Sequence, residues 1–233
     1  MQIFREIGAE LCITEEKLKH QAQNLEAFVF DWDGVFNAGT KGNGQVSGFS
    51  EVDSMGINMI RFAYWLRSGK IPFTAIVTGE QNPAATELAQ REHFQAVYFR
   101  IKHKTDALEH LQKNYSLDNE KIAFCFDDIL DLSFAQKVGL RFLVKRKSNP
   151  LFLNYAKKHE ICDYITACGG DEGAIREISE VLLWLTNAYE DTISQRVAYN
   201  ETYQNYLEQR NSIKTEFYTQ ENKKIRTTII SSG

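Results

Sequence analysis

Five short apolar runs alternate with helical patterns along the middle of this chain of 233 residues. Each run is rich in Val, Ile, Ala and Phe and carries almost no polar side chain. Runs of this kind are typical of parallel strands whose two faces are both covered. The runs are Ala27–Phe30, Phe73–Val77, Ala96–Phe99, Ile122–Phe126 and Phe142–Val144.

Apolar side chains recur at helical spacing between these runs, on stripes that pass through Met59, Leu108 and Ile178. The alternation predicts a doubly wound α/β sheet, mostly parallel, with right-handed crossovers. Residues 36–50 break the pattern, because they hold four glycines and show no helical period. The turn signal Gly42-Asn-Gly44 predicts a small β-hairpin flap there.

The patterns divide the chain into three parts. Residues 1–24 predict one N-terminal helix, and residues 25–187 predict the α/β domain. Residues 188–233 are polar and rich in tyrosine, and they predict a helical extension whose end can be disordered. Either one long association helix or a solvated tail fits that extension.

Composition limits the partners and the location of the protein. The net charge of −4 and the pI of about 5.8 argue against a nucleic-acid partner or an anionic membrane. No apolar run approaches the roughly 20 residues of a membrane span. The N-terminal segment lacks the apolar core of a signal peptide. We therefore expect a cytoplasmic protein whose scattered cysteines are reduced.

Polar residues follow the apolar runs, at the point where each predicted strand ends. In open α/β sheets ligands bind beyond the carboxyl ends of the strands, so these residues are the candidate site. They are Asp31 and Asp33 after the first run, Thr78, Gly79 and Glu80 after the second, Lys104 after the third, and Asp127, Asp128 and Asp131 after the fourth.

Carboxylates gathered in this way need a positive charge. Two of them about 4 Å apart repel by roughly 4 kcal/mol at an effective dielectric constant of 20. Ligation by oxygen alone suits Mg²⁺, which commonly meets phosphate. With a threonine and a lysine, the set indicates phosphoryl transfer, and the absence of a GxxxxGK[ST] loop favours a carboxylate nucleophile. The alternative for Asp127 and Asp128 is a helix N-cap.

The chain resembles the haloacid dehalogenase superfamily from about Phe28 to Leu185. Four motifs of that superfamily match in order, and they are Asp31-Trp-Asp33-Gly-Val, Thr78-Gly79, Lys104 and Asp127-Asp128-x-x-Asp131. The resemblance implies a Mg²⁺-dependent phosphotransferase that forms an aspartyl-phosphate.

The resemblance also implies the role of each residue. Asp31 would be the nucleophile and a Mg²⁺ ligand. Asp33 would be the general acid and base, with its backbone carbonyl on the metal, and Asp127 would be the third metal ligand. The remaining implied roles are phosphoryl binding by Thr78 and Lys104 and support from Asp128 and Asp131.

Cap length places the chain within the superfamily. Only about 45 residues separate Asp33 from Thr78, which is too few for a cap domain. The chain therefore resembles the capless branch of the 3-deoxy-D-manno-octulosonate 8-phosphate phosphatases. Its stretch Gly170-Asp-Glu-Gly173-Ala-Ile-Arg176-Glu177 is similar to the GGxGAxRE signature of that family. The resemblance implies a homo-oligomer, with a tetramer favoured, in which neighbouring subunits help to close each active site.

Two departures from the family pattern bear on the substrate and on activity. Phe126 replaces a glycine and would crowd the metal or phosphate. Thr78-Gly79-Glu80 resembles the related 2-keto-3-deoxynononate 9-phosphate phosphatases instead. Arg91, like Gly79 and Glu80, is a candidate substrate contact, because a basic residue suits the carboxylate of a sugar acid.

Three functions follow from these observations. The first is a Mg²⁺-dependent phosphatase of a small sugar-acid phosphate of the octulosonate 8-phosphate type. The second is a 2-keto-3-deoxynononate or acylneuraminate 9-phosphate phosphatase. The third is a catalytically weakened assembly domain, which the phenylalanine of the fourth motif and the C-terminal extension motivate.

Overall fold

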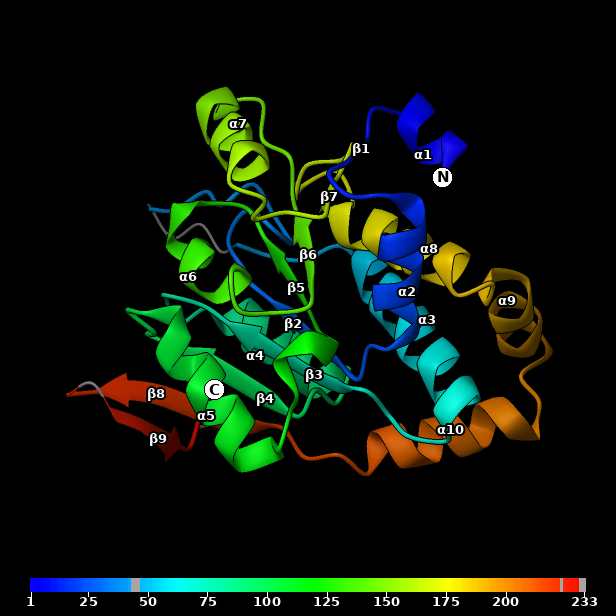
Figure 1. Cartoon of the computed structure of the whole chain (residues 1–233). Helices are drawn as coiled ribbons and strands as arrows, with labels where there is room; N and C mark the ends of the chain where they lie inside the picture. Colours follow the sequence, from blue (N-terminus) through cyan, green and yellow to red (C-terminus); the bar gives the residue numbers. More distant parts are fainter. Residues whose placement is uncertain (43–46, 223, 231–233) are drawn as a thin grey trace.

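A mixed, mostly parallel sheet of nine strands forms the centre of the protein (Figure 1). The computed structural model describes residues 1–42, 47–222 and 224–230. The strand order is β1-β7-β6-β5-β2-β3-β4-β8-β9, and only the outermost pairs, β1 with β7 and β8 with β9, are antiparallel. The strands are β1 (Glu10–Leu11), β2 (Ala27–Phe30), β3 (Phe73–Val77), β4 (Ala96–Phe99), β5 (Ile122–Phe126), β6 (Leu140–Leu143), β7 (Tyr164–Ile165), β8 (Glu216–Glu221) and β9 (Lys224–Thr228).

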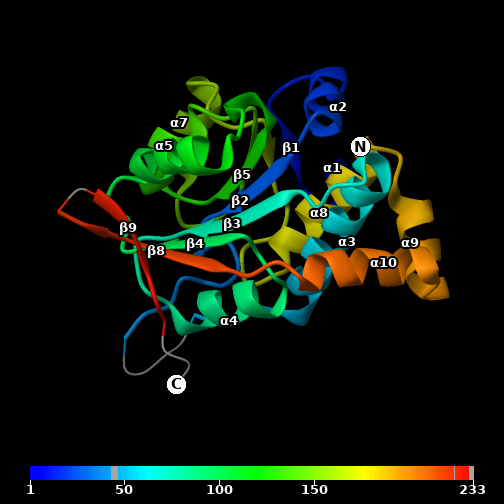
Figure 2. The same ribbon diagram turned by 90° about the horizontal axis from the view of Figure 1, so that it is seen from below.

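Helices cover both faces of this sheet (Figure 2). α2, α3, α4 and α8 pack on one face, and α5, α6 and α7 pack on the other. α9 and α10 lie outside α3. The helices are α1 (Gln2–Glu6), α2 (Glu15–Gln23), α3 (Glu51–Ser68), α4 (Pro83–Arg91), α5 (Lys104–Tyr115), α6 (Leu132–Ala135), α7 (Pro150–Lys158), α8 (Ala174–Leu185), α9 (Tyr189–Ala198) and α10 (Glu201–Asn211), with the 3-10 turns η1 (Asn119–Lys121) and η2 (Ile129–Asp131).

The central strand β2 shows why an all-apolar run correctly indicates a strand that is buried on both faces. Successive side chains of a strand point to opposite faces. Phe28 and Phe30 therefore enter the core under α3 and α8, whereas Ala27 and Val29 enter the core under α5. All four are buried. The predictions for β2 to β5 are confirmed at both ends of each strand, and the fifth run corresponds to β6.

The N-terminal prediction was wrong, since residues 1–24 do not form one helix. Gly8 adopts a φ of 108°, which a helix does not tolerate, and it separates α1 from the short strand β1. Thr14 then begins α2, where its hydroxyl accepts a hydrogen bond from the Lys17 amide at 3.3 Å. The apolar side chains that suggested one stripe belong to three separate elements.

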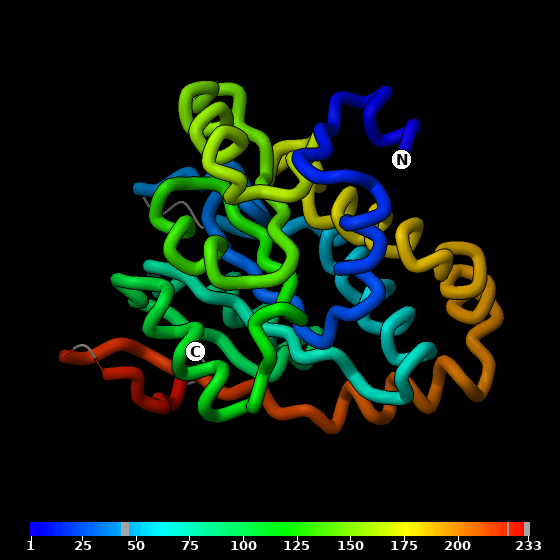
Figure 3. The backbone as a smooth tube through the Cα atoms, viewed as in Figure 1, coloured from blue at the N-terminus to red at the C-terminus, as the bar shows by residue number. Residues whose placement is uncertain are grey.

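The prediction of one long C-terminal helix was also wrong. Tyr199 takes a left-handed conformation, with a φ of 47°, and ends α9. Asn200 caps α10, because its side-chain oxygen accepts a hydrogen bond from the Tyr203 amide at 3.1 Å. The chain then crosses the base of the molecule and forms β8 and β9 (Figure 3). β8 extends the sheet as a parallel neighbour of β4.

The segment between β2 and α3 is too short for a cap domain. Its described residues, 31–42 and 47–50, contain no strand. The predicted turn at Gly42-Asn-Gly44 falls partly outside the described residues. In the part of the chain that the structure describes, no helix combines the length and the apolar character that a membrane span requires.

Candidate active site

The predicted acids meet at the carboxyl edge of four adjacent parallel strands, β5, β2, β3 and β4. A cleft of about 290 Å³ opens at this edge. Of the predicted site residues, the cleft is lined by Asp31, Asp33, Thr78, Gly79, Glu80, Lys104, Asp127, Asp128 and Asp131. It is also lined by Gly39, Lys41, Ile101, Lys102, Leu130 and Arg146, which the sequence analysis did not select.

Lys104 lies at the floor of the cleft as the first residue of α5. Its ammonium group contacts a carboxylate oxygen of Asp31 at 2.5 Å and also pairs with Asp131. Burial alone would lower the pKa of Lys104, but the negative charges of Asp131 and Asp31 raise it above its ordinary value. Lys104 is therefore a fixed, buried cation.

Asp31, Asp127 and Asp131 form a cluster of buried carboxylates. One oxygen of each lies within 4.8 Å of the other two. Burial, followed by the charge of Asp131, raises the pKa of Asp31 to about 7. Burial, followed by the charge of Asp31, raises the pKa of Asp127 to about 8. A hard divalent cation such as Mg²⁺ fits this oxygen set, because it would offset the repulsion that Lys104 offsets only in part.

Asp33 lies beside this cluster and is not part of it. Its Oδ2 atom pairs with Lys41 at 3.1 Å, whereas its Oδ1 atom is buried and has no hydrogen-bond partner among the described residues. Trp32 turns away from the cleft and donates its indole N–H to the Ser47 carbonyl at 3.0 Å. Asp33 therefore presents a carboxyl oxygen that a ligand can satisfy.

Arg146 is a site residue that the sequence analysis missed. Its Nε atom lies 2.6 Å from Oδ2 of Asp127, which lowers the cost of burying that carboxylate. Gly34 makes this contact possible, because a Cβ atom at Gly34 would collide with both Asp127 and Arg146, and its φ is 89°. Arg146 lies just beyond the end of β6, so the strand-end rule would have found it had we applied it to the fifth run.

The two carboxyl groups that follow β5 have different structural roles. Asp128 caps η2, because its Oδ1 atom accepts a hydrogen bond from the Ile129 amide at 2.7 Å. The Asp131 carboxylate in turn accepts a hydrogen bond from the Asp128 amide at 3.3 Å. The N-cap alternative is therefore correct for Asp128, while Asp127 belongs to the carboxylate cluster.

Phe126 does not crowd the cleft. Its ring is fully buried and stacks on Phe124, with ring centroids 5.6 Å apart. Both rings point into the core on the α5 side of the sheet. The strand alternates, so Phe126 faces away from the site even though it precedes Asp127 in the chain.

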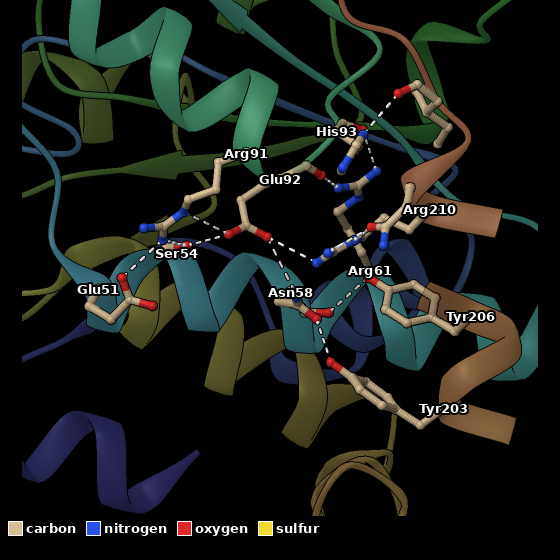
Figure 4. Close-up of polar contacts among 12 residues, drawn as sticks. Glu51, Ser54, Asn58, Arg61, Arg91, Glu92, His93, Tyr203, Tyr206 and Arg210 are labelled. Atoms are coloured by element: carbon tan, nitrogen blue, oxygen red, sulfur yellow. Dashed lines mark hydrogen bonds and ion pairs between the residues drawn. The ribbon is translucent and has the colours of Figure 1, made fainter. Parts of the chain in front are cut away.

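Arg91 is the one predicted site residue that the structure does not bring to the cleft. It is the last residue of α4, which runs back from the carboxyl edge toward the start of β4. Its guanidinium group pairs with Glu51 at 3.0 Å and with Glu92 at 3.2 Å (Figure 4). Arg91 therefore does not line the cleft, and its role as a substrate contact stays a prediction.

No family model matches the chain. It is 25% identical over 181 residues to the 3-deoxy-D-manno-octulosonate 8-phosphate phosphatase of Escherichia coli, covering 76% of this chain and 89% of that protein. It is 28% identical over 167 residues to the phosphatase of that name from Yersinia pestis, covering 70% and 82%. A solved structure from Legionella pneumophila, described as a hydrolase of HAD superfamily subfamily III A, matches with a TM-score of 0.65 at 27% identity, covering 78% and 95%.

The chain has the fold of the haloacid dehalogenase (HAD) superfamily and is similar in sequence to octulosonate 8-phosphate phosphatases. The sheet order and the missing cap domain agree with the expected capless branch. The roles of the individual residues in this chain remain predictions.

We expect Mg²⁺ to stabilise this protein more at about pH 8 than at about pH 6. The raised pKa values of Asp31 and Asp127 mean that both groups hold protons in the folded, metal-free protein at the lower pH. Unfolding releases those protons, so the metal-free fold loses stability as pH rises through about 7 and about 8. At the higher pH fewer protons occupy the carboxylates, so Mg²⁺ binds them more readily. Thermal unfolding midpoints with and without MgCl₂ measure the difference.

Two variants control this measurement. Asp127→Asn should remove most of the Mg²⁺ effect, because it deletes one ligand of the cluster. Glu109→Gln changes an exposed acid on α5 and should retain the effect. An equal rise in the midpoint at both pH values would contradict the prediction.

Proposed function

We propose that the chain is a Mg²⁺-dependent phosphomonoester hydrolase that acts on a small sugar-acid phosphate of the 3-deoxy-D-manno-octulosonate 8-phosphate type. The observation that carries the proposal is the buried Lys104–Asp31 pair, set beside Asp127 and Asp131 at the carboxyl edge of the sheet. This arrangement supports the proposal, because phosphoryl transfer requires a nucleophile, a cation for the phosphoryl oxygens and an oxygen set for the metal at one place.

The proposed chemistry uses Asp31 as the nucleophile. A carboxylate oxygen of Asp31 attacks phosphorus, the bond from phosphorus to the sugar oxygen breaks, and Asp33 gives its proton to that oxygen. Asp33 then takes a proton from water, whose oxygen attacks phosphorus, releases phosphate and restores Asp31. Lys104 and the Thr78 hydroxyl, both buried, hold the phosphoryl oxygens. When bound, Mg²⁺ supplies charge neutralisation to these oxygens and to the carboxylate cluster.

The names of the relatives support an octulosonate 8-phosphate as the substrate. Glu80, which lines the cleft, supports a nine-carbon acid, because the nononate phosphatases have Thr-Gly-Glu at this position. Phosphate release from a panel of sugar-acid phosphates with MgCl₂ present tests both. We expect the eight-carbon acid to give the highest kcat/KM. Preference for the nine-carbon acid would reassign the substrate, and no release from any member would contradict a phosphatase.

The alternative of a weakened assembly domain has lost its main support, because Phe126 packs away from the cleft. We also propose that the chain forms a homo-tetramer in the cytoplasm. Exposed Ile3, Ile7 and Trp184 support association, since they line a hollow of about 620 Å³ between α1 and α8.

A further inference from the structure

The C-terminal hairpin ends beside the active site. β8 runs parallel to β4, from Glu216 opposite Ala96 to Thr219 opposite Phe99. Parallel neighbours finish at the same edge, so the end of β8 reaches the edge that carries the catalytic cleft. Figures 1 and 2 show the hairpin of β8 and β9, in red, alongside β4 and α5.

The base of this hairpin is fixed in the core. Tyr218 is buried and stacks on Tyr98, with ring centroids 4.7 Å apart. Its hydroxyl lies 2.8 Å from that of Tyr115 on α5. Phe217 and Thr219 are also buried. The buried residues therefore fix the position of Gln220 and Glu221, which follow them at the end of β8.

Gln220 connects the end of β8, through hydrogen bonds, to the loop that precedes α5 and to the first turn of α5. Its side-chain oxygen accepts a hydrogen bond from the Lys102 amide at 2.9 Å. Its side-chain nitrogen donates to Asp106 at 2.5 Å. The hairpin and the Lys102 loop are thus held together, two residues before Lys104.

A hollow of about 480 Å³ lies between the hairpin and this loop. Lys102 also lines the catalytic cleft, so the two spaces adjoin at this residue. The lining side chains are polar, and each offers a hydrogen-bond donor, an acceptor or both. They are Lys102, His103, Asp106, Gln220 and Asn222.

We propose that this hollow, the hairpin subsite, binds the polyhydroxylated carboxylic acid part of the substrate while the phosphate lies against Lys104. The Lys102 ammonium is exposed and pairs with the substrate carboxylate. His103 and Asn222 form hydrogen bonds with substrate hydroxyl groups. Gln220 is a positioning residue, because its hydrogen bonds to Lys102 and Asp106 hold the hairpin against the loop before α5. The inference rests on the proposed function and adds that this chain supplies its own specificity element.

The curated relatives match a smaller share of this chain than of their own length. The match to the Escherichia coli protein covers 89% of that protein but only 76% of this chain. Part of this chain therefore lies outside the match.

The test compares a long substrate with a short one. Lys102→Met and Asn222→Ala should each lower kcat/KM for an eight-carbon sugar-acid phosphate about tenfold more than kcat/KM for p-nitrophenyl phosphate. The loss should lie in KM, since the subsite is remote from the reacting bond. Gln220→Ala should raise the same KM with kcat retained. Lys113→Met and Asn205→Ala, which change exposed residues on α5 and α10, are the matched controls.

The outcomes separate the subsite from the proposed function. If the unmodified protein cleaves both substrates but the variants lower both equally, or neither, the subsite is wrong and the phosphatase stands. If it cleaves neither, the phosphatase is wrong, and calorimetry with the same sugar-acid phosphate decides the subsite. Binding that Lys102→Met weakens supports the subsite, whereas no binding, or binding that the substitution leaves unchanged, overturns it.

Discussion

We expect Asp31→Asn to abolish phosphate release from every phosphomonoester while the protein remains folded. The amide that replaces the carboxylate cannot form an acyl phosphate, so the reaction loses its nucleophile. Removing the nucleophile of a covalent mechanism costs on the order of 10⁴- to 10⁶-fold in kcat. Phosphate release with p-nitrophenyl phosphate and with a sugar-acid phosphate, both with MgCl₂, measures the loss.

The fold should tolerate this substitution because burial already disfavours the charge of Asp31, as its raised pKa indicates. Lys104 retains Asp131 as an ionic partner. The thermal midpoint of the metal-free variant should therefore stay close to that of the unmodified protein. Asp191→Asn, on the exposed surface of α9, is the matched control and should retain full activity. Mg²⁺-dependent turnover in Asp31→Asn would contradict the aspartyl-phosphate mechanism.

The sequence predicted the centre of the sheet well because burial on both faces leaves a plain signal. In a run such as Ile122–Phe126 every side chain must be buried, and a central strand covered by helices on both faces achieves this. Once those strands are parallel, their carboxyl ends coincide, so Asp31 and Asp127 had to meet. The order and direction of the strands are enough to bring these two residues together, so the position of the cleft could be predicted without any distance.

The edges of the sheet carried no such signal. β8 has the sequence Glu216-Phe-Tyr-Thr-Gln-Glu221, and a polar strand of this kind becomes a strand only because β4 offers it an unpaired edge. The same limit applies to β1, which has two residues and depends on β7. Long-range pairing decides both strands, and a local pattern does not contain it.

Arg91 and Phe126 show that residue type alone does not place a side chain at a site. Arg91 ends a helix that has already returned to the amino edge of the sheet, so it pairs with Glu51 and Glu92 and does not line the cleft. Phe126 shares the face of Phe124 because strand side chains alternate. Following the chain from the strand ends would have anticipated where both side chains lie.

Lys104→Met should remove activity and also destabilise the metal-free fold. The substitution keeps a long apolar stem but leaves Asp31 and Asp131 buried without their shared cation. Removing one partner of a buried ion pair typically costs about 3–5 kcal/mol. The loss should be greater at about pH 8 than at about pH 6, because removal of the cation raises the pKa of Asp31 further and ionisation then opposes folding.

Urea unfolding at both pH values, with and without MgCl₂, measures the destabilisation, and phosphate release measures activity. Mg²⁺ should recover part of the stability, since a divalent cation offsets the same carboxylates, but it should not recover turnover. Loss of a preorganised group that stabilises transition-state charge costs about 10²- to 10³-fold in kcat. Lys113→Met, on the exposed face of the same helix, should change neither quantity. An unfolding free energy that Lys104→Met leaves unchanged at both pH values would mean that Lys104 does not compensate the buried carboxylates, whatever the effect on turnover.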